Sequence, residues 1–378
     1  MDAAVARLED GLIRLRRDLH RNPELPGEER RTAGVVAREL RAAGLAVTTG
    51  VGGHGVVGVL RGARPGRTVA YRADMDAVPP KDIIGGGRAA AHLCGHDIHT
   101  TVALGVAKVL ARLRRHLSGT VVFLFQPAEE SLSGARAMIE AGVLERTRVE
   151  EIHALHCGPF PVGRFAVTPG FGMPGQDKAE VTLQGPDAPD AARRLAAGIG
   201  ALATVTPPQT PADIERMVAD AQTPDGPLAR FVALRASAQE TKVTVSYRCW
   251  PQERYTEVRE DIRRLAESYP GTEVRFPAEP FPALLCPEPD ARALAQHLRH
   301  RLGRDAVAEL HAAFPPFSGE DYALYLDRVP GTYTFLGVHT PGTPITAGYP
   351  HFPDFAPDER AIGTGVRAMA GWLADRAR

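Results

Sequence analysis

The sequence is short of cysteine, has no excess of one charge and contains no long apolar run. Its four cysteines are too few for a disulfide scaffold and form no CxxC pair. The 45 basic residues are balanced by 45 acidic ones, which argues against a polyanionic partner such as nucleic acid. No segment approaches the roughly 18 apolar residues that a membrane span requires, so no membrane partner is expected.

The amino-terminal segment 1–20 has an amphipathic helical pattern without the apolar centre of a signal peptide. We therefore expect a cytoplasmic protein. With 378 residues, 44% of them hydrophobic, the chain is too long for one ordinary core. It fits two domains, or one large domain that carries an insertion.

The first half of the chain alternates helical and strand patterns, which is typical of an α/β sheet. Helices are expected at about 5–20, 31–43, 98–117 and 134–141, and strands at about 55–60, 68–71, 120–125 and 150–157. Asp97 is expected to be the N-cap of the third helix.

A Gly and Pro cluster at 169–175 is typical of a domain boundary. The segment from Lys178 to Phe276 suits a small α+β layer with helices on one face, and the patterns after it are expected to return to the first sheet. The sequence thus predicts an α/β fold. Its expected parts are a main α/β domain with a mixed sheet, 1–177 and 277–378, and a smaller inserted α+β domain, 178–276.

Four polar clusters lie beside predicted strands of the main domain. They are RADMDAVP, CGHDIHT, QPAEE and LHC. Ligands of open α/β sheets bind in the crevice outside the carboxyl ends of the strands, so these clusters are expected to converge there.

The clusters contain side chains that bind borderline divalent cations: a thiolate, imidazoles and a carboxylate. The candidate ligands are Cys94, His96, Glu130, His156 and His351. Asp74 and Asp76 can bind metal themselves or orient imidazole ligands. Glu129 and Glu130 are adjacent acids, which repel each other unless a cation or a proton intervenes.

Each candidate also has a structural interpretation, because a single buried His or Cys is more often a core residue than a ligand. We favour that interpretation for His92, His99 and Cys157, and we interpret His20 as a helix-end residue near the site.

Seven ordered motifs make the chain resemble the M20 metallopeptidase and amidohydrolase family. The resemblance is to the branch with hippurate hydrolases, auxin-conjugate hydrolases and N-acyl amino acid amidohydrolases. The motifs are LRRDLHRNPELPGEE, YRADMDAVP, CGHDIHTTVALG, VVFLFQPAEE with GARAMIEAGVL, IHALHCGPFPVG, FSGEDYALYL and PHFPDFAPDERAIGTG.

The resemblance implies a site with two divalent ions (Zn, Mn, Co or Ni) held by Cys94, His96, Glu130, His156 and His351. Glu129 would be the general acid and base toward a metal-activated water, with Asp74 and Asp76 supporting the ligands. The inserted domain would be a lid that also forms a homodimer.

The lid departs from the family pattern. Relatives carry a lid His that stabilises the developing oxyanion, but no His occurs here between His156 and His297. Where relatives have an Asn in an NVIP-like stretch, this chain reads SAQETKV, and the loop from Pro79 to Cys94 is short. Arg235, Gln239 and His311 remain open as replacement donors.

Three functions remain open on the sequence. The first is a metal-dependent hydrolase that cleaves the amide bond of an N-acyl amino acid or a related small amide. The second is a specialised biosynthetic enzyme whose altered lid serves to cleave or form an unusual amide. The third is a non-catalytic metal-binding homologue.

Overall fold

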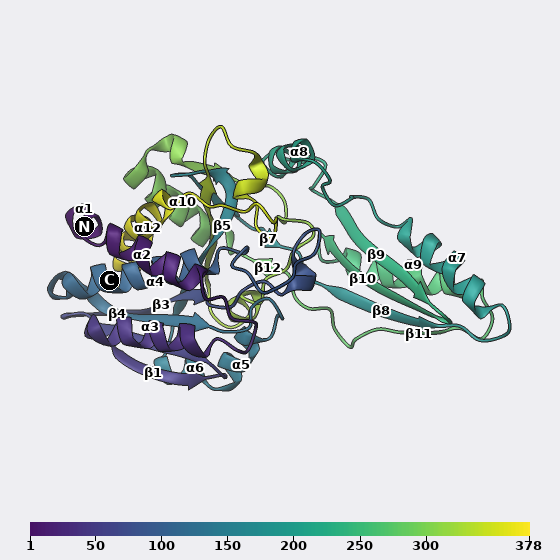
Figure 1. The fold of residues 1–378 in the computed structure, drawn as a ribbon, viewed down its shortest axis with the longest axis horizontal. Coiled ribbons are helices and arrows are strands. Elements are labelled where there is room, and N and C mark those ends of the chain that lie inside the picture. Colours follow the sequence, from purple (N-terminus) through teal and green to yellow (C-terminus); the bar gives the residue numbers. More distant parts are fainter. The chain divides into compact units, whose positions relative to one another are not determined.

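The structure, a computed structural model, describes residues 1–378 in full and divides into two compact units. The larger unit comprises Met1–Gly170, Cys286–Glu309 and Leu324–Arg378, and the smaller comprises Phe171–Leu285 and Leu310–Ala323. Figure 1 shows the elements of both units. The domain boundaries expected at 177/178 and 276/277 stay a prediction.

The larger unit is built on an eight-stranded sheet with the order β1-β2-β4-β3-β5-β14-β6-β13. Its strands are β1 (Ala46–Val51), β2 (Gly55–Arg61), β3 (Arg64–Asp74), β4 (Ser118–Gln126), β5 (Glu151–Pro161), β6 (Phe165–Val167), β13 (Val307–Glu309) and β14 (Gly331–His339). Strands β4, β3, β5 and β14 are parallel to one another in this order, and β13 is parallel to β6. The pairs β1–β2, β2–β4 and β14–β6 are antiparallel. The predicted mixed sheet is confirmed.

The helices of this unit are α1 (Asp2–Ala6), α2 (Glu9–His20), α3 (Arg30–Ala42), α4 (His96–Arg112), α5 (Gly134–Glu140), α6 (Val143–Thr147), α10 (Glu288–Leu302) and α12 (Arg360–Arg376). Six of them, α1, α2, α3, α4, α10 and α12, share one core with the sheet, and α5 and α6 follow β4 in the chain. Helix α11 (Ala323–Leu326) and the 3-10 turns Pro80–Asp82, Arg114–His116, Arg304–Ala306 and Ile345–Gly348 are short connections.

Strand residues alternate between the two faces of the sheet, and one set faces the helical core. Val69 and Tyr71 of β3 and Val121 and Phe123 of β4 belong to this core together with helix residues. The parallel strands β3, β4 and β5 are therefore packed against the helices, and their carboxyl ends meet at one edge of the sheet.

The smaller unit has a four-stranded antiparallel sheet with the order β11-β8-β10-β9. Its strands are β8 (Asp177–Thr182), β9 (Phe231–Gln239), β10 (Lys242–Trp250) and β11 (Glu273–Arg275), and β7 (Gly172–Met173) pairs separately with β12 (Leu284–Leu285). Helices α7 (Ala188–Gly200) and α9 (Arg254–Glu267) share one core with the sheet, and α8 (Pro211–Ala221) follows α7. This is the predicted α+β layer.

Several local predictions were wrong or incomplete. The helix expected at 5–20 is two helices, α1 and α2, separated at Arg7 and Leu8. Asp97 is not an N-cap, because α4 begins at His96 after Gly95, whose φ of 93° is left-handed. The sequence patterns also missed α8 and β9, and His311 lies in the smaller unit instead of the main domain.

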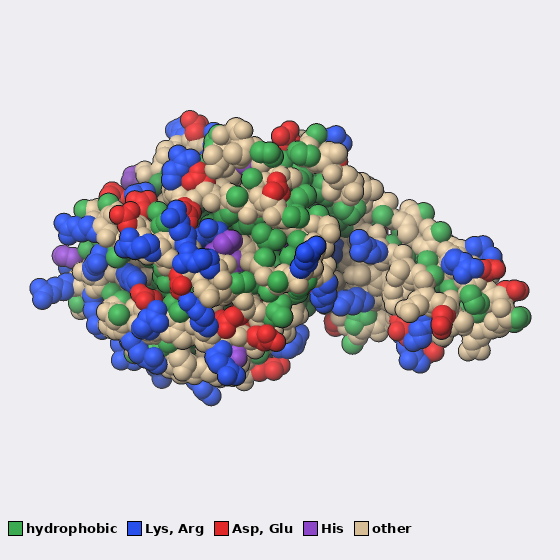
Figure 2. Space-filling view, in the orientation of Figure 1, with side chains coloured by type: hydrophobic (Ala, Val, Ile, Leu, Met, Phe, Trp, Pro, Cys, Tyr) green, Lys and Arg blue, Asp and Glu red, His purple; other side chains and the backbone are tan.

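The surface charge and the apolar character of the helices agree with the amino-acid composition. Figure 2 shows basic and acidic side chains near one another on the visible face of each unit. None of the helices combines the length and the apolar character needed to cross a membrane.

Candidate metal centre

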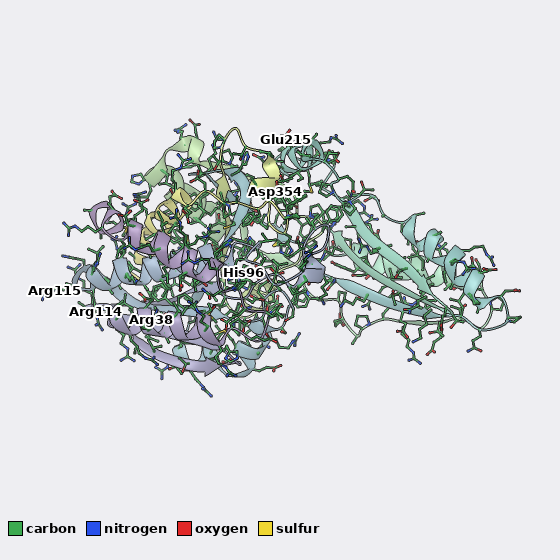
Figure 3. All side chains as sticks on the ribbon, in the orientation of Figure 1. Arg38, His96, Arg114, Arg115, Glu215 and Asp354 are labelled. Carbon is green, nitrogen blue, oxygen red and sulfur yellow. The ribbon has the colours of Figure 1, made fainter.

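The strands bring the polar clusters to one edge of the larger unit's sheet. Strands β3 and β4 are parallel, with Asp74 paired to Gln126 at their carboxyl ends. The segments that carry Asp76 and Glu130 therefore leave the sheet side by side, and the Glu130 N–H donates to Asp76 Oδ2 at 2.9 Å. Figure 3 labels His96 in the middle of this unit, whereas Arg114 and Arg115, just before β4, lie at its surface.

His96 occupies the centre of the polar cluster. Its ring is fully buried, and its Nδ1 lies 3.0 Å from the Asp76 carbonyl oxygen and 3.2 Å from Asp76 Oδ1. Its Nε2 has no hydrogen-bond partner. That nitrogen lies 3.6 Å from Asp74 Oδ2 and 3.9 Å from one oxygen each of Glu129 and Glu130.

This arrangement favours a positive charge at His96 Nε2. Burial opposes protonation, but the charge of Asp74 outweighs it and raises the pKa of His96 well above its usual value. A metal cation at the same place would satisfy the carboxylates and occupy the nitrogen that has no hydrogen-bond partner. The donors around His96 therefore fit a cation.

Cys94 and Glu130 complete one group of metal donors with His96. The ligand atoms of these three residues lie within 4.8 Å of one another. Burial raises the pKa of the Cys94 thiol, so without a cation this side chain is a neutral thiol. Burial also opposes the ionisation of Glu130, but His351 and then His96 outweigh it and lower its pKa to about 2.

His351 reaches the same group from the carboxyl-terminal part of the chain. Its Nε2 lies 3.3 Å from Glu130 Oε1, and its Nδ1 lies 3.2 Å from the Asp82 carbonyl oxygen. Its backbone N–H donates to the Leu93 carbonyl at 2.7 Å, which ties this segment to the one carrying Cys94.

His156 contributes from strand β5. Its Nδ1 lies 2.8 Å from the Cys157 carbonyl oxygen. Burial, followed by the nearby His99, lowers the pKa of His156 well below its usual value, so the ring is neutral, as a metal ligand must be. His156 forms a second donor group with Asp74, His96 and His99, whose ligand atoms also lie within 4.8 Å of one another.

His99 lies in this second group but uses both ring nitrogens. Its Nδ1 lies 2.6 Å from Asp74 Oδ1, and its Nε2 accepts a hydrogen bond of 2.8 Å from the Cys157 N–H. Because an imidazole that accepts at one nitrogen must donate from the other, His99 holds Asp74 in place and has no lone pair for a metal.

The three candidate histidine ligands share one pattern: in each, Nδ1 faces an oxygen acceptor and Nε2 remains to bind a cation. Acceptors of this kind fix the tautomer and the orientation of metal-binding imidazoles. The two donor groups overlap at His96. Each group also contains donors that the other lacks, which are Cys94 and Glu130 in one and Asp74 and His156 in the other. The arrangement therefore offers donors for more than one divalent cation.

Asp74 is held by charge as well as by His99. Arg72, two residues earlier on the same face of β3, donates from Nη1 to Asp74 Oδ2. Burial opposes ionisation of Asp74, but Arg72, His96 and His99 outweigh it and keep its pKa well below its usual range. The sequence analysis did not single out Arg72, although the two-residue spacing in YRADMD was the available signal.

A second cluster lies beside the centre at the end of α2. Asp97 Oδ2 lies 2.8 Å from both Arg16 Nε and His20 Nδ1, and Asp97 Oδ1 accepts from the Ile98 N–H at 2.9 Å. His92 stacks on His20 with 6.4 Å between ring centroids. Asp97 therefore ties α2 to the first turn of α4, which carries His96.

The sequence comparisons connect this geometry with a known group. The chain matches the model of "Peptidase family M20/M25/M40" over residues 70–375. It is 30% identical over 393 residues to a thermostable carboxypeptidase 1 of Saccharolobus solfataricus, covering 97% of this chain and 95% of that protein. It is 31% identical over 385 residues to N-acetylcysteine deacetylase of Bacillus subtilis, covering 95% of each.

A plant relative and a solved structure extend the similarity. The chain is 29% identical over 393 residues to the IAA-amino acid hydrolase ILR1-like 2 of Arabidopsis thaliana, covering 96% of this chain and 84% of that protein. The crystal structure of YxeP from Bacillus subtilis, described as a dinuclear metal binding peptidase from the M20 family, superposes with a TM-score of 0.73 at 28% identity, covering 100% of this chain and 99% of YxeP.

Proposed function

The chain belongs to the M20/M25/M40 peptidase family and is a hydrolase of amide bonds, and we propose that it cleaves an N-acyl amino acid or a related small linear amide. The observation that carries this proposal is the convergence of metal donors on His96. Relatives named for deacetylation of N-acetylcysteine and N-acetyldiaminopimelate, and for hydrolysis of IAA-amino acids, support the substrate class.

The proposed cofactor is a pair of divalent cations, Zn, Mn, Co or Ni. A thiolate, imidazoles and carboxylates suit any of these metals. The proposed ligands are Cys94, His96, Glu130, His156 and His351. Asp74 and Asp76 would support them through the contacts with His99 and with the ring of His96.

When bound, such cations acidify a water molecule and polarise the scissile carbonyl. The chain's own contribution to proton transfer is assigned to Glu129. Its Oε2 lies 3.9 Å from His96 Nε2, and the residue is buried at 5% exposure. Glu129 would take the proton of the attacking water and deliver it to the departing amine as the C–N bond breaks.

We propose that residues 178–276 act as the lid and carry a homodimer interface. Strand β9 is an edge strand of the sheet in this unit, and an edge strand offers unpaired N–H and C=O groups to another chain. The donor that replaces the usual lid His stays open among Arg235, Gln239 and His311. The cytoplasmic location likewise stays a prediction.

The altered lid favours a second candidate function. No His lies between His156 and His297, so an oxyanion donor of the usual type is absent from the lid sequence. Loss of one such donor can cost roughly 100-fold to 1000-fold in turnover. An unusual amide, cleaved or formed in a biosynthetic reaction, would account for a lid of different chemistry.

The test is hydrolysis of a panel of N-acetyl, N-benzoyl and indole-acetyl amino acids by protein reconstituted with Zn, Mn, Co or Ni. Metal-dependent release of the free amino acid is expected and would identify the acyl preference. Two metals per chain with no hydrolysis, but with condensation of acid and amine, would support the second candidate. Absence of turnover in either direction with every metal would support a non-catalytic homologue.

A further inference from the structure

Glu29 is a buried carboxyl group outside the donor groups of the metal centre. It belongs to the motif LRRDLHRNPELPGEE, most of which the proposed function leaves unexplained, and it directly precedes α3. Its exposed fraction is 0%, and burial raises its pKa to about 7. Burying a carboxyl group costs free energy unless its contacts compensate for the lost water, so its contacts are informative.

Helix capping does not explain Glu29. Its side chain makes no capping hydrogen bond at the start of α3. Glu24 does this instead, because its two carboxylate oxygens accept from the N–H groups of Arg31 and Thr32, each at 2.8 Å. The Glu29 side chain therefore has another role.

The Glu29 carboxyl group holds the loop that carries Glu129. Its Oε1 accepts from the N–H of Ala128 at 2.8 Å and from the N–H of Gly27 at 2.7 Å. Its Oε2 is buried with no hydrogen-bond partner. Ala128 immediately precedes Glu129, so this bond fixes the backbone from which the proposed proton carrier extends.

The backbone at Ala128 needs such support. Its φ of 56° is left-handed, which costs about 1–2 kcal/mol for a residue with a side chain. The Ala128 carbonyl accepts from the Gly134 N–H and the Ser131 hydroxyl, each at 3.1 Å, and closes a tight turn. Strain of this kind persists only where surrounding contacts determine the conformation.

Two carboxyl groups thus hold the loop on either side of Glu129. Glu29 binds the preceding amide of Ala128, and Asp76 Oδ2 accepts from the following amide of Glu130 at 2.9 Å. We propose that Glu29 is a positioning residue, which keeps Ala128 left-handed and so fixes the Glu129 carboxyl group for proton transfer. This inference rests on the role proposed above for Glu129.

The first test compares Glu29→Ala with Glu29→Gln, because the Gln amide oxygen can still accept from Ala128. Glu29→Ala should lower kcat by about 10- to 100-fold, since a misplacement of about 1 Å can cost 100-fold, with KM and metal content nearly unchanged. Glu29→Gln should stay within about threefold of the native kcat, as should the control Glu28→Ala at the exposed neighbouring position.

Equal kcat for native protein and Glu29→Ala would overturn the inference, as would a Glu29→Gln variant no better than Glu29→Ala. Loss of metal in Glu29→Ala would assign the residue to metal retention instead. If Glu29→Ala does not fold, Glu29→Asp, whose carboxyl group is withdrawn by one methylene, takes its place in the comparison.

A second readout does not depend on turnover. Amide hydrogen exchange in the peptide covering residues 126–134 should be faster in Glu29→Ala than in native protein or in Glu29→Gln. Adding Ala128→Gly should recover part of the lost kcat, because glycine adopts a left-handed φ without strain. Unchanged hydrogen exchange would overturn the inference whether or not any substrate is hydrolysed. Absence of hydrolysis in the native protein would separately refute the proposed function.

Discussion

At the scale of single residues, the proposed metal binding depends on which histidine nitrogen is left without a hydrogen-bond partner. His96 and His99 are three positions apart on α4, and both are buried. His96 keeps Nε2 without a hydrogen-bond partner, whereas His99 uses both nitrogens for Asp74 and Cys157. The sequence predicted the residue types and favoured a structural role for His99. It could not reveal the hydrogen bonds that separate the two residues, because those depend on tertiary contacts.

Glu130→Ala should reduce bound metal by about one equivalent per chain. The substitution removes the carboxylate from the group it forms with Cys94 and His96 and leaves His351 without its anionic neighbour. Metal analysis after dialysis of the reconstituted protein measures the effect. The exposed Glu140→Ala is the matched control and should retain native metal content, and a Glu130→Ala variant that also retained it would exclude Glu130 as a ligand.

At the scale of elements, the backbone of the loop between β4 and α5 is tightly constrained. A Cβ atom at Gly134 would lie 1.6 Å from the Pro127 carbonyl oxygen, so the turn closes only around glycine. The motif predicted this loop and the acids on it. The turn geometry, with left-handed Ala128 and Leu132, has no signal in residue type and could not be predicted.

Gly134→Ala should destabilise the protein by about 2–4 kcal/mol, because the added methyl group overlaps backbone that cannot move without opening the turn. Denaturant unfolding followed by circular dichroism measures this. Gly34→Ala in the exposed middle of α3, where nothing lies within 4 Å of the new Cβ, should instead stabilise by about 0.5–1 kcal/mol. Similar effects at the two sites would contradict the packing argument.

The errors in predicting elements have physical causes. Asp97 looked like an N-cap, but its carboxylate is used by Arg16 and His20 of α2. The sequence pattern of an N-cap cannot show whether the Asp97 carboxylate accepts from the start of its own helix or from side chains far away in the sequence. Strand β9 has only three buried residues at its start and then alternates between half-buried and exposed positions, so its apolar pattern is weak.

At the scale of the whole molecule, partly buried ion pairs join the end of the chain to the sheet. Glu151 at the start of β5 accepts hydrogen bonds from Arg376 of α12 and from Arg67 of β3, the latter at 3.3 Å. Burial opposes its ionisation, but His153 and Arg376 outweigh it and lower the pKa of Glu151 to about 2. The motifs predicted α12 and β5 but not this connection, because Glu151 lies 225 residues from Arg376.

This lowered pKa predicts a loss of stability in acid. The carboxyl group of Glu151 titrates near pH 4.3 when unfolded, so between about pH 4.3 and pH 2 the unfolded chain binds more protons. The contribution of the Glu151 carboxylate to the free energy of unfolding is fully present above that pH window and disappears as pH falls through it. Glu151→Gln should lower stability at pH 7 by about 1–2 kcal/mol, because both arginine partners are partly exposed to solvent, and should flatten the acid limb of a plot of unfolding free energy against pH. An unchanged acid limb would contradict this.

The motifs predicted the fold class and the family because they are ordered along almost the whole chain, and each follows a recognisable strand or helix. They left the acyl group, the amine and the oxyanion donor open. We propose that those features depend on the lid, where the resemblance is poorest and where Arg235 and Gln239 of β9 remain open as candidates. A pattern shared by a family identifies shared chemistry, and substrate choice depends on the residues that differ.

The most direct test of the central claim, proton transfer by Glu129 beside a metal centre, is a paired measurement on native protein and Glu129→Gln. Each is reconstituted with the same metal, and bound metal and the rate of amide hydrolysis are determined on the same sample. The account predicts equal metal content and a kcat lowered by at least about 100-fold in the variant. Native turnover in Glu129→Gln, or loss of metal along with activity, would contradict it.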